Sequence, residues 1–424
     1  MYFFSGSVAA ERIDGISHRT IIYLQDDTAG IPKNYASEYL PGFKEVEEIP
    51  EKPAELIYSV TKTRDLIESY PPPDISYLSY FGRGLSKQQA NEVQQSKLAL
   101  ILDFAYPEKH MIDGLKQSNN YVYQLAKSVN GYLWDSETRE LFTPDVWKEQ
   151  RLDAWFNDIP IVEKHIVIHA YKNTEYVRAI TLGMAKFGFP DIVVNDFSWS
   201  SNRSMGNLIN VVSQSLVEGN FPDKNGKIQI NIKELSETPF KIEMVDSLIE
   251  NAVSVVTLDT AAATWEDGDP YNYLMELKFD EGEGATLQEK QNVVLSSIFG
   301  WEDTISYVKH NQLIEEASRK AREQLEKLKT DFTAGLSPGE FIQVKAPFET
   351  PDGGSEWMWV EILSWDGDKI RGLLKNEPYN IPNLKGGAEV IVVQGDVFDY
   401  MRQHPDGSSE GNETAELIMK YQAN

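Results

Sequence analysis

The chain contains no cysteine. Disulfide bonds, thiolate nucleophiles and cysteine-ligated zinc or iron–sulfur centres are therefore excluded. The sequence also has no phosphate-binding loop of the form G-x-x-x-x-G-K-[ST], no G-x-S-x-G nucleophile turn and no H-E-x-x-H zinc motif. From these motifs we predict no catalytic residue, no cofactor and no metal.

Basic residues are in the minority, with 40 Lys and Arg against 66 Asp and Glu and a formal net charge of −26. Such an excess repels phosphate backbones and anionic lipids, which argues against nucleic acid and membrane surfaces as partners. No run approaches the about 20 apolar residues of a membrane helix, and the N-terminus lacks the basic start of a signal peptide. We expect a cytoplasmic protein whose acidity serves solubility alone or attracts a basic protein partner. The oligomeric state is not predicted.

What the chain does have is enough apolar sequence for several cores, with 41% hydrophobic residues over 424 positions. Strand-like and helix-like runs alternate, so we expect an α+β protein with a helix-covered mixed sheet in the N-terminal and middle parts. A long amphipathic helix and a small, mostly β, barrel-like C-terminal domain follow. The expected divisions are an N-terminal α+β segment (1–95), a middle α/β domain (96–300), a connecting helix (301–333), a small β domain (334–404) and a flexible tail (405–424).

Residues 97–105 are almost continuously apolar and predict a strand that is buried on both faces. A helix is expected from Pro107 to Gly131, because its apolar residues recur at helical spacing and the two residues suit its ends. Further strands are expected at 19–27, 54–63, 164–172, 191–197, 251–265 and 271–279, a hairpin within 131–147, and helices at 175–188 and 205–219.

The longest predicted helix runs from Glu302 to Phe332, where apolar residues recur every three or four positions. Its other face carries Glu–Lys and Glu–Arg pairs four residues apart with the acid first, the favourable order. It reads as a connector or docking element for the last domain, whose strands and turns extend over residues 341–401. Asp366-Gly367 is a type I′ hairpin signal within that domain.

Strand alternation over residues 356–362 places Trp357, Trp359 and Glu361 on one face. Met358, Val360 and Ile362 then share the opposite face and are predicted core residues. The two tryptophans either pack under the long helix or a neighbouring domain, which we favour, or form an aromatic surface for a partner.

The turn around Pro378 holds Asn376, Glu377 and Tyr379 rigidly, so they could bind a partner or hydrogen-bond their own loop. The candidate partner-binding residues are therefore Trp357, Trp359, Glu361, Asn376, Glu377 and Tyr379.

A possible acidic cluster consists of Glu266, Asp267 and Asp269 in one loop. Such carboxylates could bind a hard cation or supply an acid–base pair, but in so acidic a chain a solvated turn is expected. His165 and His169 would lie roughly 13 Å apart on a strand, too far to hold one metal, and we interpret them as ordinary strand-end histidines.

The C-terminal segments "QVKAPFETPDGGSEWMWVEI", "IRGLLKNEP", "LKGGAEVIV" and "DVFDYM" resemble the YegJ-type domain, a bacterial domain of unknown function. The shared pattern is a lysine-bearing first strand, an acid-aromatic-Met-Trp-Val strand, a Gly-x-Leu-x-Asn-x-Pro return and a final Asp-aromatic pair, here Asp399-Tyr400. The resemblance covers residues 315–402 and implies a compact domain preceded by a helix, with no activity attached. The upstream stretch "ITLGMAKFGFPDIVV" resembles regions that accompany this domain in longer uncharacterised bacterial proteins.

We therefore expect a bacterial multidomain protein that acts by binding rather than by catalysis, for example as an immunity-like or regulatory acidic partner protein. The acidic surface and the C-terminal aromatic strand are the candidate contact features. One alternative is a hydrolase that uses clustered carboxylates such as Asp267 or Asp269. Another is a structural or oligomerisation module.

Overall fold

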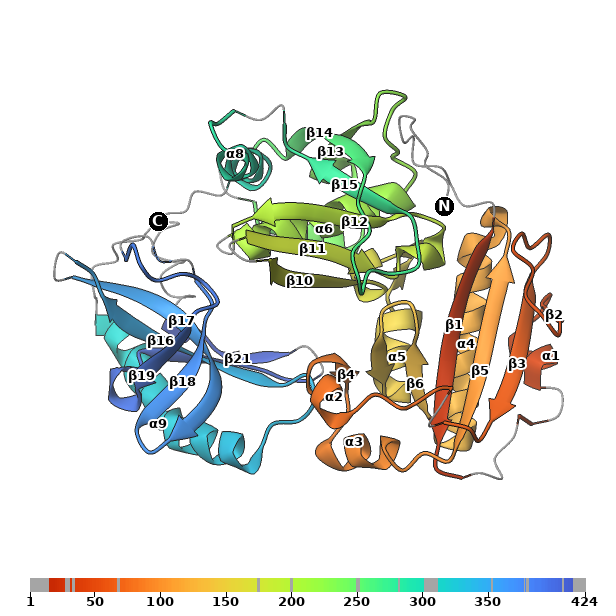
Figure 1. Ribbon diagram of the computed structural model, residues 1–424, viewed down its shortest axis with the longest axis horizontal. Helices are drawn as coiled ribbons and strands as arrows, with labels where there is room; N and C mark the ends of the chain where they lie inside the picture. The colour runs from red at the N-terminus through yellow and green to blue at the C-terminus, as the bar shows by residue number, and fades with distance from the viewer. Residues whose placement is uncertain are drawn as a thin grey trace. The chain divides into compact units, whose positions relative to one another are not determined.

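The computed structural model divides the chain into two compact units (Figure 1). The N-terminal unit consists of residues 1–74 and 91–302, and the C-terminal unit of residues 75–90 and 303–424. The chain therefore enters the second unit early, returns to the first, and completes the second only at its end. The described residues are 15–26, 31–32, 35–66, 69–173, 176–198, 201–248, 252–280, 283–300, 312–351, 354–376, 378, 381–405 and 408–414.

The first sheet of the N-terminal unit is organised around β5 (Leu98–Tyr106), which pairs antiparallel with β1 (Ile16–Leu24) and β3 (Ile57–Thr63). Every residue of β5 except Asp103 is buried, which confirms the prediction for residues 97–105. Beyond β3 lies β2 (Lys44–Glu45), and beyond β1 lie β6 (Tyr132–Asp135) and β7 (Glu140–Phe142), the predicted hairpin.

Helix α4 (Met111–Val129) packs on β1, β5 and β6 (Figure 1). Its residues Leu115, Val122 and Leu125 enter the main core. The helix begins after the 3-10 turn η1 (Glu108–His110), and it ends where Asn130 adopts a left-handed conformation with φ +51°. Asparagine tolerates this conformation, so the helix stops one residue before the predicted Gly131.

The second sheet of the N-terminal unit has the order β10, β11, β12, β15, β14, β13. β12 and β15 are parallel and the other neighbours antiparallel. The strands are β10 (Val167–Asn173), β11 (Tyr176–Leu182), β12 (Asp191–Phe197), β15 (Leu274–Lys278), β14 (Val255–Ala262) and β13 (Lys227–Asn231). Helices α6 (Asn202–Val217) and α8 (Leu287–Phe299) contact this sheet and each other.

The helix predicted over residues 175–188 is wrong. Residues 176–182 form β11, which pairs with β10 and β12 and is buried from Val177 to Leu182. Only a 3-10 turn, η4 (Met184–Phe187), follows it. A strand that is covered on both faces is apolar at most positions, so it also satisfies a helical pattern.

Short elements complete the N-terminal unit. They are α1 (Tyr35–Tyr39), α5 (Pro144–Trp147), the π-turn η2 (Lys148–Leu152), β8 (Trp155–Phe156), β9 (Ile159–Pro160), η3 (Val162–Lys164), η6 (Ile232–Glu234) and α7 (Pro239–Asp246).

The C-terminal unit is an antiparallel sheet with the order β19, β18, β17, β16, β20, β21 (Figure 1). Helix α9 (Gln312–Ala334) packs on it through Leu325 and Leu328, and the predicted helix residues 302–311 lie outside the described residues. The strands are β16 (Phe341–Glu349), β17 (Ser355–Asp366), β18 (Lys369–Leu374), β19 (Glu389–Val393), β20 (Asp399–Gln403) and β21 (Ser409–Gly411). The 3-10 turn η7 (Gln394–Asp396) lies between β19 and β20.

Residues 75–90 belong to this C-terminal unit and form α2 (Ile75–Phe81), β4 (Gly82–Arg83) and the start of α3 (Lys87–Val93). The Ser79 carbonyl accepts a hydrogen bond from the Gly339 amide at 2.5 Å. The Lys87 ammonium donates to the Ala334 carbonyl at the end of α9, also at 2.5 Å. The early segment therefore caps the junction between α9 and β16.

Two glycines shape the β17–β18 hairpin. Asp366 pairs with Lys369, so the two-residue loop is Gly367-Asp368, one residue later than the predicted Asp366-Gly367 turn. Gly367 adopts φ +59° and Asp368 does not have a positive φ, which is the pattern of a type II′ rather than a type I′ loop. A Cβ atom on Gly372 would lie 2.2 Å from the Glu361 carbonyl oxygen, so the glycine of the Gly-x-Leu-x-Asn-x-Pro pattern permits this close approach.

The α+β class is confirmed, with a mixed sheet in the N-terminal unit and a β-rich C-terminal unit. The C-terminal sheet is not a closed barrel within the described residues, since β19 and β21 are its two edges.

Candidate functional site

The predicted alternation along β17 is present. Met358, Val360 and Ile362 are buried, and they share a core with Leu325 and Leu328 of α9. Because the helix covers this face, it cannot also cover the other face of the same sheet. The part of the preferred prediction that places the tryptophans beneath the long helix is therefore wrong, and packing against a neighbouring domain stays a prediction. We call the face opposite α9 the outer face.

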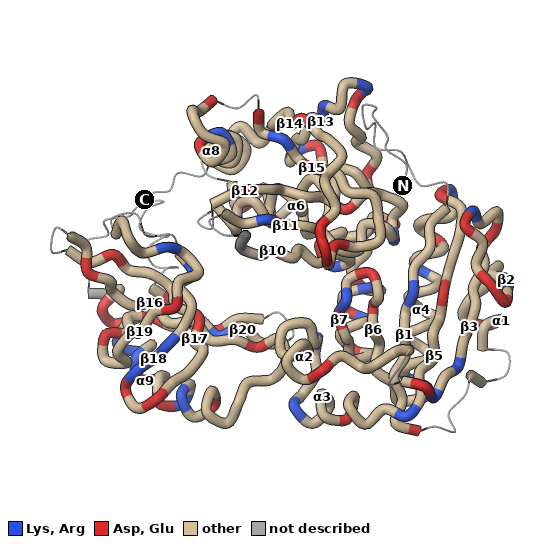
Figure 2. The backbone as a smooth tube through the Cα atoms, in the orientation of Figure 1, with Lys and Arg blue, Asp and Glu red and all other residues tan. Residues whose placement is uncertain are grey.

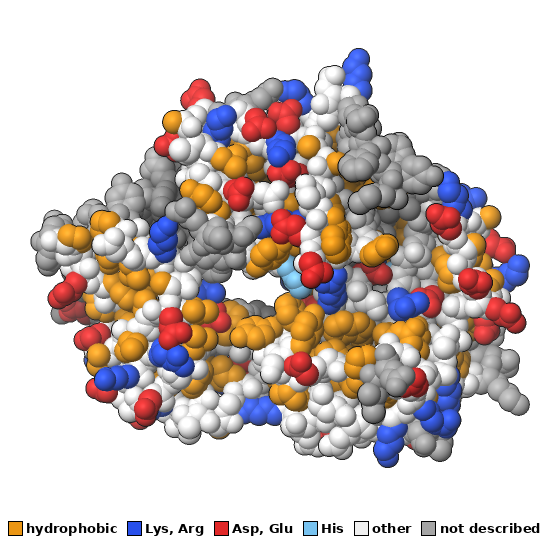
Figure 3. All heavy atoms as spheres, in the orientation of Figure 1, with side chains coloured by type: hydrophobic (Ala, Val, Ile, Leu, Met, Phe, Trp, Pro, Cys, Tyr) orange, Lys and Arg blue, Asp and Glu red, His pale blue; other side chains and the backbone are white. Residues whose placement is uncertain are grey.

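The outer face is partly apolar. Trp357 is 37% exposed, and its ring lies 4.7 Å from that of Phe398 between centroids. At the β19 edge, Ile391 is 64% and Val393 40% exposed. The face of this unit that Figure 3 shows carries hydrophobic side chains between charged ones.

A row of three side chains crosses the outer face on adjacent strands: Asp399 of β20, Lys345 of β16 and Trp359 of β17 are direct cross-strand partners. The Lys345 ammonium lies 5.8 Å from the centre of the Trp359 ring. It makes no hydrogen bond or ion pair with any residue that the structure describes. Burial lowers the pKa of Lys345, against the raising effect of Asp399.

Hydrogen bonds from Thr414 and Tyr400 fix the Asp399 carboxylate. Its side chain accepts hydrogen bonds from the Thr414 hydroxyl at 2.5 Å and the Thr414 amide at 3.0 Å. The Tyr400 amide donates to the other carboxylate oxygen at 2.8 Å. Burial nevertheless raises the pKa of Asp399, and the residue is 1% exposed.

Asn376 hydrogen-bonds to the backbone of Trp359. Its side-chain oxygen accepts a hydrogen bond from the Trp359 amide at 2.6 Å, and the Lys375 amide donates to the Trp359 carbonyl at 2.8 Å. Asn376 thus continues the β17 ladder beyond the end of β18. Glu361 pairs with the Lys375 ammonium at 2.9 Å. The other two candidates of this turn, Glu377 and Tyr379, lie outside the described residues.

Sequence reasoning gave Lys345 and Asp399 no functional role, although both stand in the family pattern. The signal that marks them is the strand register, which brings both beside Trp359.

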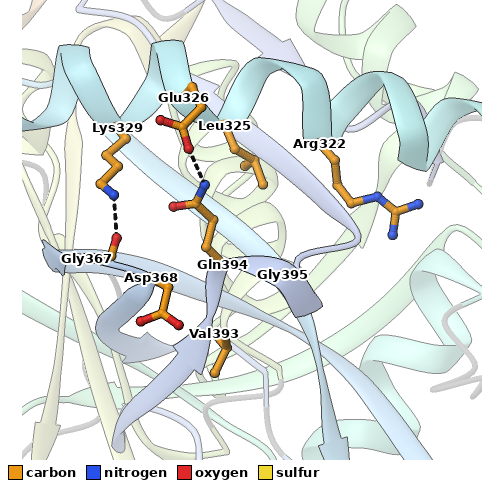
Figure 4. A pocket seen from close by; sticks show the side chains of 9 residues that line it. All are labelled: Arg322, Leu325, Glu326, Lys329, Gly367, Asp368, Val393, Gln394 and Gly395. Carbon is orange, nitrogen blue, oxygen red and sulfur yellow. Dashed lines mark hydrogen bonds between the residues drawn. The ribbon is translucent and has the colours of Figure 1, made fainter.

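A hollow of about 570 Å³ lies between α9 and the edge of the sheet (Figure 4). Its polar groups bind each other: Lys329 donates to the Gly367 carbonyl, and Gln394 donates to Glu326 at 2.7 Å. Arg322 points away from these pairs in Figure 4. The hollow is thus largely a helix-to-sheet junction.

The acidic cluster of the N-terminal unit is not an open set of carboxylates. Asp269 binds Arg178 through both oxygens at 2.8 Å, and both side chains are at most 3% exposed. Glu266 accepts a hydrogen bond from the Tyr171 hydroxyl at 3.0 Å. Asp267 is exposed. The expected solvated turn is therefore present at Asp267 but wrong for Asp269, which anchors the loop.

We expect Asp269→Asn to lower the free energy of unfolding by about 2–3 kcal/mol, because it leaves the buried Arg178 charge undercompensated. Arg178 keeps its contacts with Glu266 and Tyr171, which limits the loss. Urea denaturation of the full chain measures the change. Asp267→Asn is the matched control and should stay within about 0.5 kcal/mol of the parent. Equal stabilities of the two variants would contradict the anchoring role.

A buried charge cluster in the N-terminal unit escaped sequence reasoning. Asp135 lies 2.7 Å from the Lys186 ammonium and 3.1 Å from the Arg151 guanidinium, and all three side chains are at most 3% exposed. Burial opposes ionisation of Asp135, but the two cations outweigh it and hold its pKa well below the usual range. Perturbed pKa values often mark active sites. Here the charges are closed off from solvent, which favours a structural role.

The two predicted strand-end histidines differ. His169 lies on β10, whereas His165 precedes the strand and is fully buried. Its ring contacts those of Trp155 and Phe187 at 5.4 and 5.7 Å, and burial lowers its pKa well below the usual value. His165 therefore acts as a neutral aromatic core residue.

Within the described ranges, no three His, Asp or Glu side chains are grouped so as to hold a metal ion. In the same part of the chain, no helix combines the length and apolar character needed to cross a bilayer.

Comparison with known proteins finds one relative and one family model. A putative ankyrin repeat protein of Neisseria meningitidis serogroup B is 38% identical over 69 residues, which are 16% of this chain. The matched part is 27% of that protein's length, so the chain spans about a quarter of its curated relative. No solved structure matches the chain.

A family model described as "Uncharacterized protein conserved in bacteria (DUF2314)" matches residues 311–422. The match contains α9 and all the strands from β16 to β21. It confirms the resemblance of the C-terminal part to an uncharacterised bacterial domain, while the likeness suggested for the upstream part stays a prediction. The C-terminal part of this chain is thus similar to the family DUF2314, whose description assigns it no function.

Proposed function

We propose that the protein acts by binding another protein through the outer face of its C-terminal sheet. One observation carries this proposal: the core beneath α9 does not include Trp357, whose side chain stays 37% exposed on the outer face beside Phe398. Exposed, clustered aromatic side chains on a rigid strand are the usual anchors of protein interfaces. The name of the ankyrin-repeat relative also supports an interaction role, since such repeats form extended binding surfaces.

The partner is proposed to be basic, and the role immunity-like or regulatory in the cytoplasm of a bacterium. The net charge of −26 supports this choice, and acidic residues are spread over both units (Figure 2). A negative field of this kind accelerates encounter with a positive partner at low salt.

The alternative hydrolase has less support. Asp269 is engaged by Arg178, and Glu266 by Tyr171. Asp267 is then left without a second free carboxylate in the cluster, whereas acid–base hydrolysis by carboxylates uses two. In the oligomerisation alternative, the outer face would bind a second copy of the chain.

The test is affinity capture from a bacterial lysate with the full chain and with a Trp357→Ala/Trp359→Ala variant. We expect the variant to retain a specific partner at least about 30-fold less well, since interface hot spots contribute about 2 kcal/mol or more. Raising salt should slow association if the partner is basic.

Trp265→Ala is the matched control, because Trp265 is 52% exposed but lies in the N-terminal unit. Equal capture by the double variant and the control would contradict the proposal. Light scattering of the purified chain decides the oligomerisation alternative: a dimer that the double variant abolishes would replace the partner with a second copy.

A further inference from the structure

The Lys345 ammonium has no hydrogen-bond acceptor among the described residues. An ammonium has three donors, and none binds a described residue, although the side chain is partly buried. A charge that is partly removed from water is unfavourable, and an acceptor from a ligand would offset this cost. Burial lowers the pKa of Lys345, the direction expected of a cation that lacks enough negative charge nearby.

Asp399 does not meet this need. Its oxygens accept hydrogen bonds from Thr414 and Tyr400, and no ion pair joins it to Lys345. Asp399 is also 1% exposed, whereas Lys345 is half-buried. A ligand approaching the outer face therefore reaches the ammonium and not the carboxylate.

We propose that Lys345 and Trp359 form a site for a carboxylate group. The carboxylate accepts hydrogen bonds from the Lys345 ammonium, and the apolar part of the ligand lies over the Trp359 ring towards Trp357, two residues away on the same face. This inference rests on the proposed use of the outer face and names one chemical group that the partner presents there, from an acidic side chain or a chain end.

The surroundings favour a single negative charge. The nearby Lys375 ammonium is already paired with Glu361 at 2.9 Å, so Lys345 stands as the one cation of the row. Phosphate sites usually gather several cations or backbone amides around the group. The carboxylate of Asp399, the cross-strand partner of Lys345, and the net charge of −26 both oppose a dianion.

The test uses the full chain labelled with 5-fluorotryptophan, in which the Trp359 resonance is assigned with Trp359→Phe. The probes are a short apolar peptide with a free C-terminal carboxylate, the same peptide as its C-terminal amide, and inorganic phosphate. We expect the free acid to shift the Trp359 resonance saturably, and the amide and phosphate to bind at least tenfold more weakly. Lys345→Met should weaken binding of the acid at least tenfold.

Lys369→Met is the matched control. Lys369 is an exposed lysine on the same face, in strand β18, which adjoins the strand β17 of Trp359. It should bind the acid as the parent does. Equal binding of acid and amide, tighter binding of phosphate, no shift, or full binding by a folded Lys345→Met would each overturn the carboxylate site. If capture of the partner still depends on Trp357 and Trp359 in that case, the proposed function survives and only this site fails.

Discussion

Replacing Asp135 with asparagine should lower the free energy of unfolding of the N-terminal unit by about 3–5 kcal/mol. The substitution removes the negative charge that Lys186 and Arg151 share at 2.7 and 3.1 Å. Both cations would stay buried, and the carboxylates that remain near them would compensate less. Glu140 lies 3.5 Å from Arg151, and Glu137 and Asp191 act on Lys186 without a direct ion pair. Breaking a buried pair from one side leaves the partner's charge uncompensated, so the loss exceeds that of a surface pair.

Asp145→Asn is the control for this prediction. Asp145 pairs with Lys127 at 3.2 Å, but its side chain is 84% exposed. Exposed pairs contribute about 0–1 kcal/mol, so the control should unfold close to the parent. Denaturant titration followed by tryptophan fluorescence measures both variants. A loss below about 1 kcal/mol for Asp135→Asn would show that the charge cluster does not stabilise the N-terminal unit.

We expect His18 to make the free energy of unfolding of the N-terminal unit strongly pH-dependent below pH 6.5. The residue is buried, its Nε2 lies 3.1 Å from the Ser118 hydroxyl, and its ring stacks on Phe104. Burial, together with the charge of Lys186, lowers the pKa of His18 to about 3. The folded state thus binds the proton more weakly than the unfolded state, in which the pKa is near 6.5.

The sign follows from this difference. Above pH 6.5 neither state holds the proton, and the contribution of His18 is fully present. As the pH falls towards 3, the unfolded state takes up the proton first and stability is lost, by up to about 5 kcal/mol at about 1.4 kcal/mol per pKa unit. Asp191 and Glu137 act in the opposite direction, because their pKa values are raised to about 6 and about 7.

The measurement is the unfolding free energy of the parent and of His18→Gln at pH 4 and pH 7. The difference between parent and variant isolates His18, since Asp191 and Glu137 are common to both. We expect the parent's advantage to shrink towards pH 4. Ser118→Ala is the control: it removes the hydrogen-bond partner but keeps the imidazole, so its difference from the parent should change little with pH. A constant advantage of the parent over His18→Gln would refute the linkage.

Local patterns predicted the C-terminal unit well. The period of two along β17 identified Met358, Val360 and Ile362 as core, and the helical period identified Leu325 and Leu328 on α9. The same approach misassigned β11, where Val177, Ile180 and Met184 recur at spacings of three and four as in a helix. A fully covered strand has no polar face, and period alone cannot distinguish it from a buried helix.

The charged parts of the structure depend on pairings that no local pattern contains. Asp135 and Lys186 are 51 residues apart, and Arg178 and Asp269 are 91 residues apart. Which acidic residue becomes buried is decided by the strand register and by the cation that the fold brings to it. The same holds for Lys345, whose neighbours on the outer face come from β17 and β20.

The place of residues 75–90 in the C-terminal unit has a consequence for how the chain is made. A ribosome synthesises α2 long before α9 and β16. The Ser79 carbonyl nevertheless finds its donor only in the Gly339 amide, and the Lys87 ammonium finds its acceptor only in the Ala334 carbonyl. The N-terminal unit can therefore fold before residues 75–90 find their partners, and the C-terminal unit folds last. A fragment restricted to residues 311–422 lacks that cap. We therefore expect the smallest stable form of the C-terminal unit to include residues 75–90, from the first quarter of the chain.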